Sequence, residues 1–106
     1  MTDSYEDKYS PLQRMYRLRN DCDNRALSKA IEQIHDIRGH GSILTGAQLY
    51  LLKDRCYVCV NFRYKHVNDK RLACIHAILL GCCVEVDDVS GASLLQDPTF
   101  HAAIPL

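Results

Sequence analysis

Residues 56–63 read Cys-Tyr-Val-Cys-Val-Asn-Phe-Arg, and the neighbouring segments are arranged around this stretch. Apolar side chains at every second position alternate with a mixed set. Such alternation points successive side chains to opposite faces of an extended chain. β-Branched and aromatic residues favour this half-buried setting. We therefore predict a β-strand with one wholly apolar face.

A second apolar segment, residues 49–52, comes just before this strand, and Lys53-Asp54-Arg55 lies between them. This spacing predicts a hairpin, because an isolated strand needs a partner. Another interpretation stays open at this point. Thr45 followed by Gln48 three residues later fits a capping box that would begin a short helix instead.

After the predicted strand, residues 72–80 are almost wholly apolar, which is typical of a buried helix. Asn68 can cap this helix and Asp69 suits the positive end of its dipole. Gly81 is expected to end it in the left-handed conformation. Residues 82–86 alternate again, so strand, helix and strand predict a right-handed crossover that makes the two strands parallel.

Two helices are predicted before this central part of the chain. Ser10-Pro11-Leu12-Gln13 resembles a helix start with a capping box, and the helix is expected to fade near Asn20. Residues 27–37 carry apolar side chains at the spacing of one helical face, with Asp23 or Asn24 as the cap and Gly39 at the end.

These elements predict an α+β fold in the order α-α-β-β-α-β: two N-terminal helices packed on a short mixed sheet with one buried crossover helix. Residues 1–9 lack periodicity and are expected to form a flexible acidic arm, with residues 10–106 as a single domain. After the last strand, Ala92–Leu95 can form one helical turn. The apolar tail that follows is expected to dock on its own core or on a neighbouring molecule.

Charge is unevenly distributed along a chain whose net charge is zero. Residues 39–71 hold six basic side chains against two acidic ones, whereas residues 72–106 hold four acidic side chains and no Lys or Arg. Because the net charge is zero, bulk electrostatics favours neither nucleic acid nor a membrane as partner. The polar N-terminus does not read as a signal peptide, so we expect a cytoplasmic protein with reduced thiols.

Cysteine spacing raises the question of a metal site. Cys56 and Cys59 are three residues apart, and Cys74, His76 and Cys82 could add ligands. A strand, however, points residues three apart to opposite faces, and no Gly or Pro provides a tight turn. We predict no metal and no cofactor, with a zinc-stabilised module as an alternative.

Covalent catalysis would need a cysteine and a histidine that meet in space. The candidates are Cys22 or Cys59 with His35, His40 or His66. Nothing in the pattern indicates an orienting residue or an oxyanion hole. No catalytic residue is predicted, and we expect that the protein is not an enzyme.

Residues 62–71 form the most promising functional stretch, because aromatic side chains that can stack on bases alternate with cations that can neutralise phosphates. The predicted partner-binding residues are Arg63, Tyr64, Lys65, His66, Lys70 and Arg71. No glycine-rich phosphate loop or helix-turn-helix accompanies them.

We therefore predict a small non-catalytic regulator or inhibitor that occupies a surface of a protein partner. A nucleic-acid-binding regulator that uses residues 62–71 is the alternative. Homodimer formation is a further option, because open sheet edges tend to associate.

Overall fold

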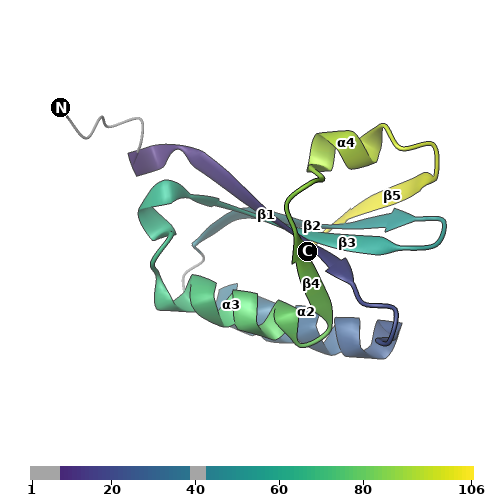
Figure 1. Cartoon of the computed structure of the whole chain (residues 1–106). Coiled ribbons are helices and arrows are strands. Elements are labelled where there is room, and N and C mark those ends of the chain that lie inside the picture. Colours follow the sequence, from purple (N-terminus) through teal and green to yellow (C-terminus); the bar gives the residue numbers. More distant parts are fainter. Residues whose placement is uncertain (1–7, 39–42) are drawn as a thin grey trace.

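The computed structural model describes residues 8–38 and 43–106. The elements in this part of the chain are β1 (Pro11–Leu18), α2 (Asn24–Arg38), β2 (Leu44–Leu52), β3 (Cys56–Arg63), the 3-10 turn η1 (Tyr64–His66), α3 (Lys70–Leu80), β4 (Cys83–Val86), α4 (Gly91–Leu95) and β5 (Phe100–Pro105). The strands form one sheet in the order β4-β1-β3-β2-β5 (Figure 1), and every neighbouring pair is antiparallel. From β1 to β4 the order β-α-β-β-α-β, with β1 and β3 at the centre, is the split βαβ or ferredoxin-like arrangement.

The prediction of a helix from Ser10 to near Asn20 is wrong, and with it the order α-α-β-β-α-β and the mixed sheet. Residues 11–18 form β1, which pairs with β3 on one side and β4 on the other. A helix cap contributes about 1 kcal/mol. Pairing on both edges buries Met15 and Tyr16, which are 2% and 0% exposed, so long-range burial outweighs the local signal.

The crossover from β3 through α3 to β4 gives two strands that run in the same direction, since both are antiparallel to β1. They are not neighbours, however, because β1 lies between them. The same relation holds for β1 and β2, with β3 in the gap. This interleaving is why a single domain with helical crossovers contains an entirely antiparallel sheet.

The predicted hairpin is confirmed as β2 and β3, and the short helix beginning at Thr45 is wrong. The Leu52 N–H donates to the Arg55 carbonyl at 2.9 Å across the turn. A register shift between Leu44 and Gly46 interrupts the ladder at Thr45. β3, paired on both sides, is the most deeply buried strand.

Helices α2 and α3 cover one face of the sheet (Figure 1) and form the larger core cluster with it. Asp23 caps α2, as predicted, by accepting from the Ala26 N–H at 3.0 Å. For α3, two details differ from expectation. The cap is Asp69 and not Asn68, and Gly81 has a φ of −65°, so it is right-handed. Gly39 lies outside the described residues.

The opposite face is covered in part by α4 (Figure 1), and Leu94 of α4 and Phe100 of β5 belong to the apolar cluster with Met15, Tyr57 and Cys59. The predicted turn at Ala92–Leu95 is confirmed, and the tail docks on its own sheet by pairing with β2. These elements make a small domain of mixed helix and sheet. Within residues 8–38 and 43–106, no helix has the length and apolar character needed to cross a membrane.

Candidate binding surface at the basic end of the sheet

The turn that follows β3 is held by backbone hydrogen bonds at one end of the sheet. The Tyr64 N–H donates to the Ser10 carbonyl at 2.9 Å, which links the turn to the chain just before β1. Within the turn, the Val67 N–H donates to the Tyr64 carbonyl and the Asp69 N–H to the His66 carbonyl. Side chains on this segment therefore project from a fixed backbone.

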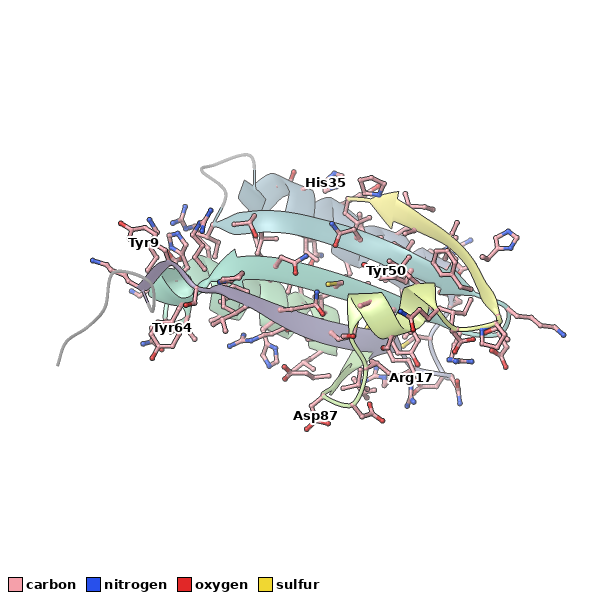
Figure 2. All side chains as sticks on the ribbon, turned by 90° about the horizontal axis from the view of Figure 1, so that it is seen from above. Tyr9, Arg17, His35, Tyr50, Tyr64 and Asp87 are labelled. Carbon is pink, nitrogen blue, oxygen red and sulfur yellow. The ribbon has the colours of Figure 1, made fainter. Side chains whose placement is uncertain are left out.

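Tyr9 is a contact of this turn that the sequence did not reveal. The Arg63 guanidinium donates to the Tyr9 carbonyl at 3.1 Å. The Lys65 ammonium lies 4.7 Å from the centroid of the Tyr9 ring, a cation–π contact. Figure 2 shows Tyr9 and Tyr64 at the same end of the molecule. The predicted flexible arm thus contains a residue that contacts the domain, while its residues 1–7 lie outside the described part.

Arg71 has a structural task. Its guanidinium binds both carboxylate oxygens of Asp69, at 3.1 and 2.9 Å. Asp69 also accepts from the Arg71 N–H at 2.8 Å as the cap of α3. These bonds from Arg71 lower the pKa of Asp69 to about 2. Arg71 therefore fixes the start of α3, and Asp69 balances its charge.

The remaining predicted residues, Arg63, Tyr64, Lys65, His66 and Lys70, define what we call the basic end. Arg63, Lys65 and Lys70 are exposed. In the described part of the chain, no ion pair joins these three cations to a carboxylate. Tyr64 is 52% exposed beside them, which is unusual for a large aromatic side chain. The basic end thus combines unneutralised positive charge with an aromatic surface.

A surface hollow of about 390 Å³ lies beside the basic end. It is lined by Arg14, Val67, Asn68, Asp69, Ala73, His76 and Glu85. The Tyr16 hydroxyl and His76 Nδ1 are hydrogen-bonded at 2.8 Å. Burial, with the nearby Glu85 charge, raises the pKa of Tyr16 to about 12, so the phenol stays protonated. The hollow carries both charge signs, from Arg14 on one hand and Asp69 and Glu85 on the other.

The fold brings some of the candidate ligands together and separates others: Cys56 and Cys82 share one buried cluster, Cys59 lies in another, and Cys74 is exposed. Cys56 packs in the cluster beneath the helices and Cys59 in the cluster on the opposite face, as the strand argument requires. Burial raises the pKa of the Cys59 thiol to about 11, which disfavours the reactive thiolate. Among the residues that the structure describes, no three His, Cys, Asp or Glu side chains gather closely enough to hold a metal ion. His40 lies outside them.

Comparison with known proteins gives no family model, no curated protein and no solved structure that matches this chain. The basic end is therefore interpreted from its own geometry and charge.

Proposed function

We propose that the protein is a small non-catalytic regulator that binds an acidic segment of a protein partner at its basic end. One observation carries this proposal: exposed cations, which form no ion pair within residues 8–38 and 43–106, lie on a fixed turn with an exposed tyrosine. Positive potential attracts an acidic partner and speeds association. Tyr and Arg are also the side chains that most often dominate protein interfaces.

A protein partner is favoured over nucleic acid because the tyrosines on the α4-covered face of the sheet are buried. Proteins that bind single-stranded RNA on a sheet stack the bases on exposed aromatic side chains. Here Tyr50 and Tyr57 are only 8% and 6% exposed, beneath the segment that carries α4. Nucleic acid remains the second candidate function because Tyr64, amid cations, offers a surface on which one base could stack.

The proposal includes a cytoplasmic setting with reduced thiols. All six cysteines are free, and four of them are buried as packing residues. Disulfides are rare in reducing compartments, so this use of cysteine suits such a location.

Fluorescence anisotropy with two labelled probes tests the function. One probe is a short glutamate-rich peptide and the other is a single-stranded oligonucleotide of equal net charge. Reversing two charges with Lys65→Glu and Lys70→Glu is expected to weaken peptide binding about 10-fold or more, because attraction becomes repulsion. The matched control, Lys29→Glu with Lys53→Glu, makes the same charge change on α2 and at the β2–β3 turn, away from the basic end.

An equal loss of peptide binding in both double variants would show that net charge and not the basic end is responsible. Absence of peptide binding at low salt would also contradict the proposal. If the oligonucleotide binds more tightly than the peptide and loses affinity in Tyr64→Ala, the second candidate function replaces the first.

A further inference from the structure

Strand β5 is an outer strand of the sheet, and no other strand in the part of the chain that the structure describes pairs with its outer edge. β5 pairs with β2 from Gln48↔Pro105 to Leu52↔Phe100, and the Leu106 N–H donates to the Ala47 carbonyl at 2.9 Å. In an antiparallel ladder, only alternate residues direct both backbone groups at a given neighbour. Residues 102, 104 and 106 are therefore bonded to β2. Ala103 turns its N–H and carbonyl outward, and Pro105 turns its carbonyl outward.

The two outer strands of the sheet are protected very differently. β4 is four residues long, contains Glu85 and is followed by the exposed Asp87 and Asp88. Short length and charge are the usual means by which a sheet edge avoids pairing with other chains. β5 is six residues long and contains no Asp, Glu, Lys or Arg. Two features limit what can pair with it: Pro105 lacks an N–H, and the ladder has a register irregularity between Phe100 and Ala102.

The side chains of β5 suit a second copy of the same strand. Ile104 and Ala102 both point to the face that carries the helices, and Ile104 is 42% exposed. If two β5 strands pair about a twofold axis at Ala103, each Ile104 lies opposite an Ala102. A large side chain then meets a small one twice, and no like charges face each other.

The same register satisfies both outward backbone groups of Ala103. Each Ala103 N–H meets the Ala103 carbonyl of the other copy, which gives two hydrogen bonds. Each Pro105 lies opposite His101 of the other copy and can accept from its N–H, but Pro105 has no N–H to donate to the His101 carbonyl. The ladder is therefore centred on the two Ala103 bonds and is weaker at its ends.

We propose that β5 is a homodimer interface in which two sheets join antiparallel at Ala103 into one continuous sheet. The axis then runs perpendicular to the sheet, so α2 of both copies lies on the same face. Figure 2 shows His35 of α2 on the side of the molecule where β5 lies. Contacts between the two α2 helices would extend the interface beyond the strands, as a stable dimer requires.

Analytical ultracentrifugation of the full chain tests this interface. Ala103→Pro removes the outward N–H and places a ring at the edge, while the bonds of residues 102 and 104 to β2 are kept. The dissociation constant of the dimer is expected to rise about 30-fold or more, from two lost bonds and a steric clash. Ala103→Val keeps the N–H and is the matched control, which should remain dimeric.

A second measurement covers the case in which Ala103→Pro detaches β5. Hydrogen exchange of the wild-type Ala103 amide should be slow in concentrated protein and faster on dilution, because only the dimer protects it. A wild-type chain that stays monomeric at concentrations on the order of 100 µM overturns the proposal. So does a dimer in which the Ala103 amide exchanges freely, since that dimer must use another surface.

Discussion

The two faces of the sheet are covered in different ways. On one face, α2 and α3, with 15 and 11 residues, lie over a continuous apolar cluster. On the other, α4 has five residues and covers a smaller cluster. Beyond α4, that face is polar: the Gln13 side chain donates to Asn61 at 3.0 Å and Asn61 to Gln48 at 3.2 Å. The first face therefore provides most of the stability of the fold, and the second holds a small attached segment.

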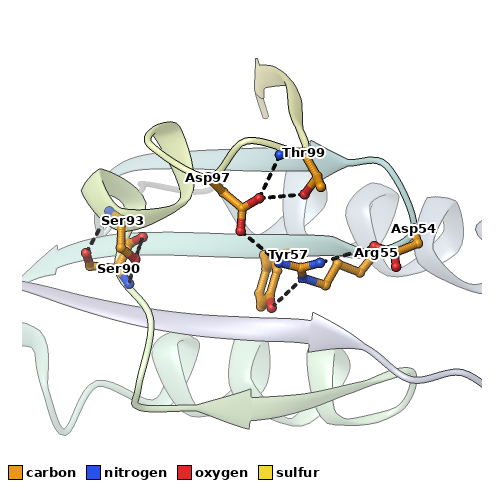
Figure 3. A network of polar contacts seen from close by, with 7 residues as sticks. All are labelled: Asp54, Arg55, Tyr57, Ser90, Ser93, Asp97 and Thr99. Atoms are coloured by element: carbon orange, nitrogen blue, oxygen red, sulfur yellow. Dashed lines mark hydrogen bonds and ion pairs between the residues drawn. The ribbon is translucent and has the colours of Figure 1, made fainter.

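Polar contacts hold this attached segment, residues 87–105, to the sheet. Asp97 accepts from the Thr99 N–H at 2.8 Å and forms an ion pair with Arg55 at 2.9 Å (Figure 3). A reciprocal capping box between Ser90 and Ser93 begins α4. The Ser90–Ser93 and Asp97–Thr99 contacts lie within the segment, whereas the Arg55 ion pair and the β2–β5 ladder join it to the sheet. We expect α4 to open at a lower free energy than the helix-covered core because its apolar cluster is smaller.

The largest effect is expected beneath the helices. Leu79 is 0% exposed, and Leu79→Ala should reduce the free energy of unfolding by about 2–5 kcal/mol through lost burial and a cavity. Leu80, next to it on α3, is 40% exposed. Leu80→Ala is the matched control and should change stability by less than about 0.5 kcal/mol. Urea unfolding followed by circular dichroism measures both.

On the other face, Leu94→Ala tests the attached segment. Leu94 is 2% exposed and its neighbour Leu95 is 53% exposed, which again gives a matched pair. We expect a cost of about 2 kcal/mol, at the low end for such changes because the cluster is small. A loss as large as that of Leu79→Ala would mean that the two faces contribute equally.

A close approach between α4 and the sheet makes Gly91 necessary. A Cβ at this position would lie 2.6 Å from the Tyr50 hydroxyl oxygen. Gly91→Ala should therefore destabilise the protein by about 1–2 kcal/mol in thermal unfolding. Tyr50→Phe removes that oxygen, so Gly91→Ala should cost less when it is combined with Tyr50→Phe. Equal costs with and without Tyr50→Phe would argue against this contact.

The smallest expected effect is on stability at acidic pH. Two carboxylates with lowered pKa values, one on each side of the sheet, contribute to it. Arg71 lowers the pKa of Asp69, and Thr99, with Arg55, lowers that of Asp97. A depressed folded-state pKa gives stability above the unfolded value of about 3.9, and this stability is lost as pH falls through the folded value. For Asp69, that window extends from about pH 4 down to about 2.

Asp69→Asn and Asp97→Asn should therefore each show a shallower fall in the urea midpoint between neutral and acidic pH than the wild type. Asp97→Asn should also speed hydrogen exchange in α4, which Asp69→Asn should not. An unchanged acid profile in both variants would show that these carboxylates titrate normally.

Local periodicity was sufficient to predict α2, α3, β3 and the hairpin, because each has a regular apolar pattern. It failed for β1. Leu12, Arg14 and Tyr16 share the face toward the helices. Because Arg14 is charged, the sequence does not show the apolar alternation that is typical of a strand. The Arg14 guanidinium lies 5.2 Å from the centroid of the Phe62 ring, so a charged residue covers apolar surface. β5 has a weak pattern and depends on its pairing with β2.

The candidate site was predictable to the extent that it is contiguous in sequence. Arg63, Tyr64 and Lys65 lie together on the turn. The contacts of Tyr9 and the pairing of Arg71 with Asp69 depend on side-chain geometry, which spacing does not reveal. The open edge at Ala103 depends on a register between distant segments.

Residue-resolved hydrogen exchange of the full chain tests most directly whether the helix-covered face alone carries global stability. Amides of β1, β3 and α3, such as Tyr16 and Leu79, are expected to exchange only through global unfolding. The Leu94 amide in α4 should exchange through a local opening of lower free energy. If Leu94 exchanges as slowly as Leu79, or if the amides of β1 exchange as fast as those of α4, the helix-covered face does not alone carry global stability.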